Sequence, residues 1–398
     1  MSLNYRITPE GTRDFVFEEC AMRRELEQKM SSLFQARGFT EVTTPEIEFL
    51  DVFTVKNHPI PVEDMYKLSD RKGRLIALRA DSTMPIARVF STRLKDELLP
   101  MRLFYNQKVY RSTPSLAGHS DEILQSGIEI IGAKGKRADL EVIATAVEAL
   151  GNLGISDYRL EIGHIAIFNR LMEKLWIDDE LGESIRELIE TKNYPALNDL
   201  VDSRLDETAA GMIKRLPRLF GSDEVFDEAI KLFHDEEITK TVEYLRGIYN
   251  DLTMLGLQNK ISVDLGMVNR ASYYTGVLFR GYISGFGQAV LSGGRYDNLL
   301  TAFGTPSPAT GFGINLDAIL ASLFAVHSIK RELPADMLVY SEDSYEMNGL
   351  LYARDLIAQN KRVEHSVFET LEESKQYALK KGIPEIVIVG ETVQTIQL

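Results

Sequence analysis

Hydrophobic side chains recur at three- and four-residue steps through residues 15–37, which is the spacing of one face of an amphipathic helix. The positions on that face are Met22, Leu26, Met30, Leu33 and Phe34. Gly38 is expected to end the helix, because glycine readily takes the left-handed conformation found just after helix C-termini. Residues 40–43 then alternate in polarity and predict a short strand.

Strand and helix patterns occupy separate stretches of the first 330 residues. The strand-like segments are 75–79, 101–111, 123–131 and 273–292, and the helical ones are 139–151 and much of 165–256. A glycine-rich turn at 285–287 would fold the last strand segment into a hairpin. This separation favours an α+β fold in which helices flank an antiparallel sheet. We expect a domain over residues 1–330, with the charged region 165–256 as a helical insertion.

A different pattern, alternating strand and helix, runs through residues 335–398. The predicted order is strand 337–340, helix 346–359, strand 362–368, helix 371–381 and strand 385–389. These elements predict a small, separate C-terminal α/β domain.

The composition limits the classes of protein that fit. The chain has 398 residues, of which 44% are hydrophobic, enough for a large core in two or three domains. No stretch approaches the roughly 18 consecutive apolar residues of a membrane span, and the N-terminus shows no apolar signal region. Cys20 is the only cysteine, so no intramolecular disulfide can form and a cytoplasmic location is expected.

Charge and histidine spacing argue against nucleic acid and metal. The net charge is −14, from 45 basic and 59 acidic residues, whereas nucleic-acid binders usually carry a basic excess. The six histidines show no metal-ligand spacing, and no common phosphate-binding glycine motif is present. We therefore expect no metal site and no cofactor, and tRNA binding is not favoured.

Polar residues of the 123–131 strand share one face. Because side chains alternate with period two, Gln125, Gly127 and Glu129 point to one side while Ile128 and Ile130 point to the other. An amide and a carboxylate beside a gap would suit a small polar ligand. The alternative is a half-exposed strand whose polar residues face water, and the strand alone favours that alternative.

Three other segments show comparable patterns. Arg79, Asp81 and Thr83 would share one face if the segment 78–83 stayed extended. The aromatic segment 273–276 is typical of cross-strand packing. The paired glycines in 292–297 predict a strand-to-helix turn where backbone approaches a ligand or another strand closely. Each pattern alone is explained equally well by packing.

Together and in order, these segments resemble class II histidyl-tRNA synthetases over roughly residues 5–325. The shared motifs are P-E-G-T-R-D-F at 9–15, G-F-T-E-V-T-T-P at 38–45, L-R-A-D-S-T at 78–83, Y-R at 110–111, Q-S-G-I-E-I-I-G at 125–132, Y-Y-T-G at 273–276 and G-G-R-Y-D at 293–297. The resemblance implies a six- or seven-stranded antiparallel class II sheet and a homodimer.

The resemblance also implies a histidine pocket. Its residues would be Asp81, Thr83, Gln125, Glu129, Tyr273 and Tyr274. Glu129 would accept a hydrogen bond from the imidazole, and Tyr274 would bind the other side of the ring. Asp81, Thr83 and Gln125 would face the α-amino group, since an ammonium requires a carboxylate and other acceptors. The family usually has glutamate at position 81, and aspartate is one methylene shorter.

Departures from the synthetase pattern lie on the ATP side. The glutamate expected to receive the adenine amino group is Thr113, and expected basic positions hold His119 and Asp121. The catalytic arginine position is Asn269, and the arginine that would clamp ATP is Ala318. Removing one preorganised electrostatic contact typically costs about 10²- to 10³-fold in rate, so we expect synthetase activity to be lost.

The carboxylate of a bound histidine is then left without its usual partner. Arg111, Arg270 and Arg295 are the candidates for this carboxylate or another anion. Arg270 follows Asn269 directly, so its side chain would project to a different face unless the loop shifts register.

A synthetase-like core with an amino-acid pocket and no ATP chemistry resembles the regulatory subunits of ATP phosphoribosyltransferase. That resemblance implies a non-catalytic subunit that pairs with a short catalytic subunit in the first step of histidine biosynthesis. It implies histidine as an allosteric ligand and a homodimer within a hetero-oligomer, with a hetero-octamer of four chains of each kind as the family pattern. The segment 335–398 resembles a reduced anticodon-binding domain with few basic residues.

Two other functions remain open from the sequence. One is a divergent but active histidyl-tRNA synthetase, and the other is a synthetase-like enzyme acting on another substrate. Histidine-dependent pyrophosphate exchange with ATP distinguishes both from a non-catalytic subunit.

Overall fold

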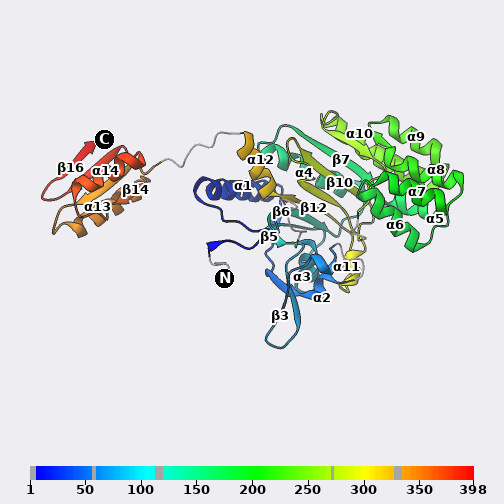
Figure 1. The fold of residues 1–398 in the computed structure, drawn as a ribbon, viewed down its shortest axis with the longest axis horizontal. Coiled ribbons are helices and arrows are strands. Elements are labelled where there is room, and N and C mark those ends of the chain that lie inside the picture. The colour runs from blue at the N-terminus through cyan, green and yellow to red at the C-terminus, as the bar shows by residue number, and fades with distance from the viewer. Residues whose placement is uncertain (1–5, 56–59, 113–119, 270–272, 327–333) are drawn as a thin grey trace. The chain divides into compact units, whose positions relative to one another are not determined.

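The computed structural model describes residues 6–55, 60–112, 120–269, 273–326 and 334–398 (Figure 1). The chain divides into two compact units, one up to His327 and one from Ser328. None of the helices in the described ranges is long and apolar enough to cross a membrane.

The first unit is built on a nine-stranded sheet. In spatial order its strands are β1 (Thr40–Glu41), β5 (Met101–Tyr110), β6 (Glu122–Ile131), β12 (Ala309–Asn315), β11 (Leu291–Arg295), β10 (Val277–Ile283), β7 (Tyr158–His164), β9 (Ile261–Asp264) and β8 (Phe220–Gly221). The six strands from β5 to β7 pair antiparallel, which confirms the predicted sheet. Short edge strands make it larger than the expected six or seven, and β1 and β9 pair parallel with their neighbours.

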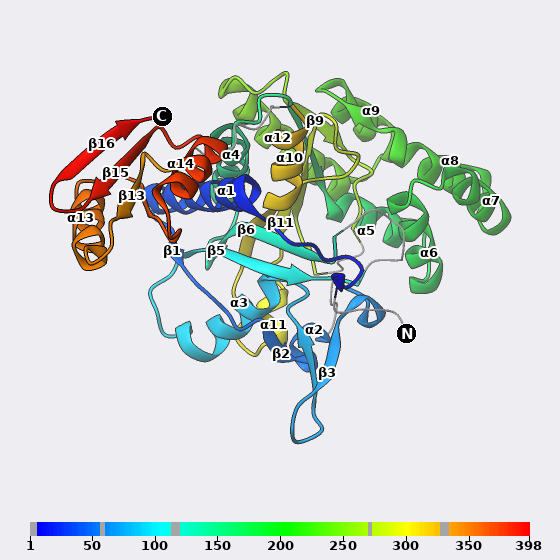
Figure 2. The ribbon, with the colours of Figure 1, turned by 60° about the vertical axis from the view of Figure 1, so that its left-hand side comes forward.

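Three helices cover one face of this sheet. They are α1 (Phe17–Ala36), α4 (Lys136–Asn152) and α12 (Leu316–Val326), and both Figure 1 and Figure 2 place them on the same side of β5 and β6. Phe34 of α1 lies with its ring centroid 5.8 Å from that of Phe104 and 6.1 Å from that of Phe312. The predicted amphipathic helix therefore buries its apolar face against the sheet.

The opposite face of β5 and β6 packs on smaller elements. These are α2 (Leu50–Phe53), α3 (Thr83–Val89), α11 (Leu299–Ala302), the 3₁₀ turn Val62–Asp64 and the π-helical turn Phe90–Leu94. Along β5, Phe104 joins the helix-covered core, while its neighbours Leu103 and Tyr105 join the second core. The predicted alternation in β6 is confirmed in the same way, because Ile128 and Ile130 belong to the helix-covered core.

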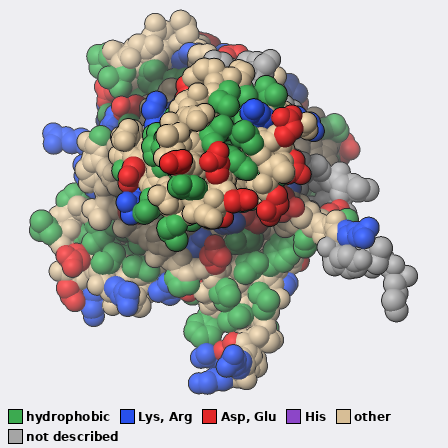
Figure 3. Space-filling model, turned by 90° about the vertical axis from the view of Figure 1, so that its left-hand side faces the viewer, with side chains coloured by type: hydrophobic (Ala, Val, Ile, Leu, Met, Phe, Trp, Pro, Cys, Tyr) green, Lys and Arg blue, Asp and Glu red, His purple; other side chains and the backbone are tan. Residues whose placement is uncertain are grey.

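A three-stranded antiparallel sheet projects from this second face. Its strands are β2 (Ile47–Phe49), β4 (Leu75–Leu78) and β3 (Lys67–Ser69). The β3–β4 hairpin has an exposed basic tip at Arg71, Lys72 and Arg74. Figure 3 shows basic side chains at the end of a projection and hydrophobic ones nearer its base, where Ile47 and Leu68 are about half exposed.

Six helices form the predicted insertion between β7 and β9. They are α5 (Ile165–Lys174), α6 (Asp179–Glu190), α7 (Tyr194–Arg204), α8 (Glu207–Arg215), α9 (Glu224–Phe233) and α10 (Glu236–Met254), with a 3₁₀ turn at Leu216–Arg218. Side chains of Asp178, Asn193, Asp206 and Asp235 accept backbone N–H groups at four of their N-termini. Such caps satisfy donors that the first helical turn leaves unpaired.

The second unit has a four-stranded sheet. Its elements are β13 (Met337–Ser341), α13 (Glu346–Ala358), β14 (Val363–His365), α14 (Leu371–Lys381), β15 (Glu385–Val389) and β16 (Val393–Gln397). The strand order is β14-β13-β15-β16, and the first three strands are parallel. The predicted five-element α/β pattern is confirmed, and β16 is an additional antiparallel edge strand.

Two local predictions were wrong. Residues 78–83 do not stay extended, because β4 ends at Leu78 and α3 begins at Thr83. Arg79 consequently turns away from Asp81 and donates to the carbonyls of Lys108, Thr44 and Pro45 at 2.7–2.9 Å. The paired glycines of 292–297 lie inside strand β11 rather than in a turn.

Candidate functional site

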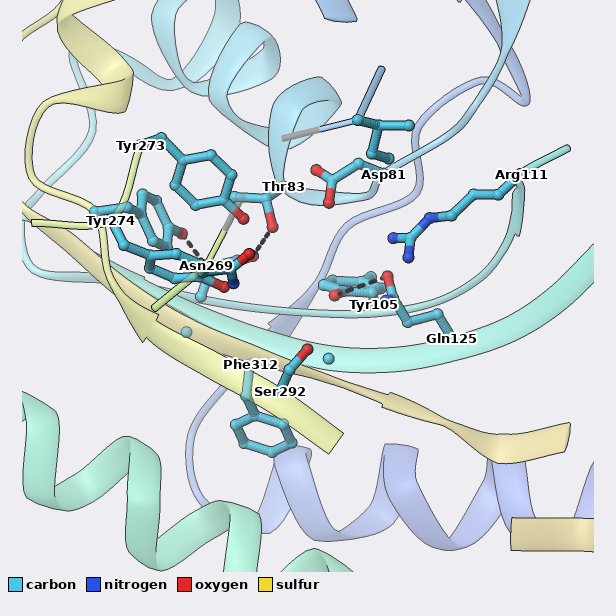
Figure 4. A pocket seen from close by; sticks show the side chains of 15 residues that line it. Asp81, Thr83, Tyr105, Arg111, Gln125, Asn269, Tyr273, Tyr274, Ser292 and Phe312 are labelled. Carbon is cyan, nitrogen blue, oxygen red and sulfur yellow. Dashed lines mark hydrogen bonds between the residues drawn. The ribbon is translucent and has the colours of Figure 1, made fainter. Parts of the chain in front are cut away.

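A cavity of about 190 Å³ opens on the face of the sheet that carries α3 and α11 (Figure 4). It is lined by Ile60, Asp81, Thr83, Tyr105, Arg111, Gln125, Glu129, Asn269, Tyr273, Tyr274, Ser292, Tyr296, Gly311, Phe312 and Gly313. Sites for drug-sized ligands usually measure about 300–1,000 Å³. This cavity therefore suits a ligand no larger than a single amino acid.

Glycines form the floor of the cavity. Gly311 pairs with Glu129 across the β12–β6 ladder, and a Cβ atom at this glycine would lie 1.8 Å from Oε2 of Glu129. A Cβ atom at Gly313 would lie 2.8 Å from the Gln125 amide nitrogen. The missing side chains leave room for the carboxylate and the amide to lie flat over the neighbouring strand.

Glu129 is buried at the centre of this floor. One oxygen accepts a hydrogen bond from the Thr83 hydroxyl at 2.8 Å, and the other accepts one from the Tyr296 phenol. Burial raises the pKa of Glu129 to about 8, although both hydrogen bonds act to lower it. At neutral pH the carboxyl is therefore protonated, and it can share one proton with a basic ligand.

Asp81 lies at the start of α3, where it accepts the backbone N–H of Met84 at 2.9 Å. Burial raises the pKa of the Asp81 carboxyl, and the nearby positive charge of Arg111 opposes that shift. Across the cavity, the Gln125 carbonyl oxygen accepts a hydrogen bond from Tyr105 at 3.2 Å (Figure 4). These groups place several acceptors around one end of the cavity.

Aromatic rings form the opposite wall. The ring centroids of Tyr273 and Tyr274 lie 4.5 Å apart, and Tyr273 meets Tyr296 edge to face at 5.7 Å. Burial raises the pKa of Tyr274 to about 12, so its hydroxyl remains a hydrogen-bond donor at physiological pH. This wall suits a flat, partly polar ring.

A second cavity of about 830 Å³ lies beyond Arg111, which lines both cavities. It is lined by Gly11, Thr12, Arg13, Phe15, Glu19, Arg111, Ser120, Ile123, Phe286, Gln288, Asn315, Asp317, Ala318, Ala321 and Phe324. Asp317 forms a two-pronged ion pair with Arg23 at 2.6 and 3.0 Å and also accepts the backbone N–H of Leu124. The neighbouring Ala318 is buried and carries no charge.

Sequence comparisons decide the family. The sequence model of a family described as histidyl-tRNA synthetase matches residues 11–319. An ATP phosphoribosyltransferase regulatory subunit from Clostridium kluyveri is 40% identical over 383 residues, covering 94% of this chain and 97% of the relative. One from Bacillus mycoides is 40% identical over 390 residues, covering 96% and 91%. The chain belongs to the ATP phosphoribosyltransferase regulatory subunit family.

Solved structures place the regulatory-subunit fold beside the synthetases. A protein from Bacillus halodurans described as an ATP phosphoribosyltransferase regulatory subunit/histidyl-tRNA synthetase has a TM-score of 0.83 and 29% identity, covering 93% of this chain and 96% of that one. A histidine–tRNA ligase subunit from Alicyclobacillus acidocaldarius has a TM-score of 0.70 and 26% identity, covering 80% and 97%. These similarities confirm the class II synthetase-like fold.

Most of the residues singled out in the sequence meet in the smaller cavity. Asp81, Thr83, Gln125, Glu129, Tyr273, Tyr274 and Arg111 all line it. Arg295 does not, because its guanidinium is held by the carboxylates of Asp139 and Asp297 and by two backbone carbonyls. Arg270, Thr113 and His119 lie outside the described residues.

Four further lining residues were not predicted: Tyr105, Tyr296, Gly311 and Gly313. Tyr105 lies directly opposite Gly127 in the β5–β6 ladder, so period-two alternation from Gln125 could have indicated its face. The glycines follow each other at a two-residue step in A-T-G-F-G-I-N, a segment whose strand character the sequence did not show because glycine weakens strands.

Proposed function

We propose that this chain is a non-catalytic regulatory subunit of ATP phosphoribosyltransferase and that it senses histidine in the smaller cavity. The observation that carries this proposal is the arrangement of acceptors around Asp81 at one end of an amino-acid-sized cavity and a buried, proton-sharing carboxyl, Glu129, at the other. The printed names of the relatives supply the enzyme that it regulates.

The groups of the cavity match those of histidine. The ligand ammonium would lie near the Asp81 carboxylate and the Gln125 carbonyl, since a cationic amine requires charge-assisted acceptors. The imidazole would lie against Tyr274 and share one proton with Glu129. A neutral Glu129 facing a neutral imidazole has the same proton count as a carboxylate facing an imidazolium, so binding near neutral pH needs no proton uptake.

Adenylate chemistry is not supported by the second cavity. Formation of an aminoacyl adenylate develops negative charge on a phosphate, which preorganised cations must stabilise. Arg13 and Arg111 are the only Lys or Arg among the described residues that line this cavity, and the expected clamp position is the neutral Ala318. Asn269 is likewise neutral where the synthetase pattern has its catalytic arginine.

Histidine can regulate a partner only if it binds two states of the complex with different affinity. The proposed partner is the short catalytic subunit, and the proposed assembly is a homodimer of this chain within a hetero-oligomer in the cytoplasm. Histidine would then report the level of the end product to the first step of its own biosynthesis. Neither tRNA nor ATP is required for this role.

Reconstitution tests the proposal. The short catalytic subunit is assayed for ATP phosphoribosyl transfer alone, and then with increasing amounts of this chain. We expect activity to rise to a plateau as the chain is added. Histidine-dependent pyrophosphate exchange with ATP by this chain should be at background, and robust exchange would contradict the proposal.

A further inference from the structure

The carboxylate of a bound amino acid needs a partner in the smaller cavity. The proposed function assigns the ligand ammonium to Asp81 and the imidazole to Glu129, while Asn269 offers only a neutral amide to the carboxylate. We propose that Arg111 holds this carboxylate, and that the free carboxylate is the group by which the site selects its ligand. This inference rests on the proposed function and adds the chemical class that the site accepts, a zwitterionic α-amino acid.

Arg111 is held in place from two sides. Its backbone N–H donates to the carbonyl of Asp121 at 2.8 Å, and its Nε–H donates to the carbonyl of Ala80 at 2.9 Å. Figure 4 shows the end of the guanidinium directed toward the space between Asp81 and Gln125. A planar fork of N–H donors fixed in this way matches the two oxygens of a carboxylate.

The distribution of charge in the cavity also points to Arg111. Among the described residues that line the cavity, Arg111 is the only Lys or Arg. Two neighbouring arginines are engaged elsewhere, since Arg79 donates to three backbone carbonyls and Arg295 pairs with two carboxylates. Asp81 and Arg111 thus present opposite charges side by side, as the ammonium and carboxylate of a zwitterion do.

The position of Arg111 between the two cavities determines how selection works. The larger cavity, about 830 Å³, continues beyond the guanidinium, so the space behind the ligand carboxylate is not closed by a wall. A small extension of the carboxyl group can be accommodated there. Discrimination at this end is therefore electrostatic rather than steric, and an amide in place of the carboxylate fits but loses the ion pair.

Calorimetric titration of the full chain with L-histidine, L-histidinamide and histamine tests the inference. Histidinamide keeps the size and removes the charge of the carboxylate, and histamine removes the group. A hydrogen-bonded ion pair of this kind corresponds to about tenfold or more in affinity. The wild-type chain should bind histidine at least about tenfold more tightly than either analogue.

Arg111→Met should lower the affinity for histidine to that of the analogues and leave both analogues within about twofold of their wild-type affinity. Arg111→Lys should retain part of the preference. Arg13→Met is the matched control, because Arg13 lines only the larger cavity, and it should keep the wild-type preference.

An equal loss of affinity for all three ligands in Arg111→Met would assign this arginine a structural role and overturn the inference. The same conclusion follows if wild-type protein binds histidinamide as tightly as histidine, a measurement that does not depend on whether any variant folds. If the wild-type chain binds histidine in none of these titrations, the proposed histidine sensor itself fails. Tight, carboxylate-independent histidine binding sinks only the role of Arg111.

Discussion

The phenol of Tyr296 donates a hydrogen bond to Glu129, and the Thr83 hydroxyl donates to the other oxygen of the same carboxyl. Glu129 therefore stays in one position whether or not a ligand is present. These two contacts favour the ionised carboxylate, yet burial outweighs them and raises the pKa of Glu129 to about 8. The balance between burial and hydrogen bonding at this one group gives measurable pH dependence.

The free energy of unfolding should depend on pH through Glu129. Its pKa is about 8 when folded and about 4.3 when unfolded. The folded state thus binds the proton more tightly, so the stabilisation is fully present below about pH 4.3 and is lost as the pH rises to about 8. Glu129→Gln removes this titration. Its stability relative to wild type should increase over that window by a few kcal/mol, as measured by urea denaturation.

Tyr296→Phe provides the control for this titration. The phenol lowers the pKa of Glu129, so its removal should move the upper end of the window to higher pH. A difference between Glu129→Gln and wild type that does not vary with pH would show that Glu129 does not carry the raised pKa.

Histidine affinity should be greatest between the pKa of the free imidazole, about 6.5, and that of Glu129, about 8. In this interval one proton is already present on the pair, and binding neither releases nor takes up a proton. Below it, binding must release a proton, and above it, binding must take one up, so affinity should fall on both sides. Calorimetry in buffers of different ionisation enthalpy measures the protons exchanged. An affinity that keeps rising above pH 8 would rule out the shared proton.

Gly311→Ala should abolish histidine binding. The new Cβ atom would lie 1.8 Å from Oε2 of Glu129 and 2.3 Å from the carbonyl oxygen of Ile128, so the carboxyl must move. Overpacking of this kind also typically destabilises by about 1–3 kcal/mol. Calorimetric titration with histidine and urea denaturation measure the two effects.

Gly211→Ala in α8 is the matched control, because a Cβ atom there meets no other atom within 4 Å. Helix propensity predicts that it stabilises the fold by about 0.5–1 kcal/mol without changing histidine affinity. Wild-type affinity in Gly311→Ala would mean that the ligand does not lie over Glu129.

The Arg23–Asp317 pair should stabilise the wall of the larger cavity. Both side chains are largely buried, and Asp317 also accepts the backbone N–H of Leu124 in β6. Arg23→Met would leave a buried carboxylate without its cation, at a cost of about 1–3 kcal/mol in the free energy of unfolding. Arg354→Met breaks the exposed pair with Asp355 and should have almost no effect on stability. Equal effects of the two variants in urea denaturation would contradict this assignment.

The sequence predicted what depends on periodicity. The faces of β6 followed from strict alternation, which is why Gln125 and Glu129 could be placed in one cavity before the fold was known. The long helix α1 and the α/β order of the second unit were equally clear, since their apolar positions recur at regular steps. The motif resemblance then added Tyr273 and Tyr274, whose aromatic character alone indicated only packing.

Features that depend on contacts distant in sequence could not be predicted. Arg295 belongs to a prominent motif, but its burial by Asp139 requires α4 to pack beside β11. The turn of the chain at Asp81 is set by the start of α3, which removes Arg79 from the cavity. Tyr296 reaches Glu129 only because the β11, β12 and β6 strands lie side by side, a pairing that the glycine-rich β12 segment did not reveal.

Inhibition of the reconstituted complex by histidine is the most direct test of the proposed sensor. Complexes of the short catalytic subunit with wild-type chain and with Glu129→Ala are titrated with histidine while ATP phosphoribosyl transfer is measured. We predict that both complexes are active without histidine, that the wild-type complex is inhibited, and that the Glu129→Ala complex is not. Inhibition of the Glu129→Ala complex at the same histidine concentrations as wild type would contradict the assignment of this cavity as the histidine sensor.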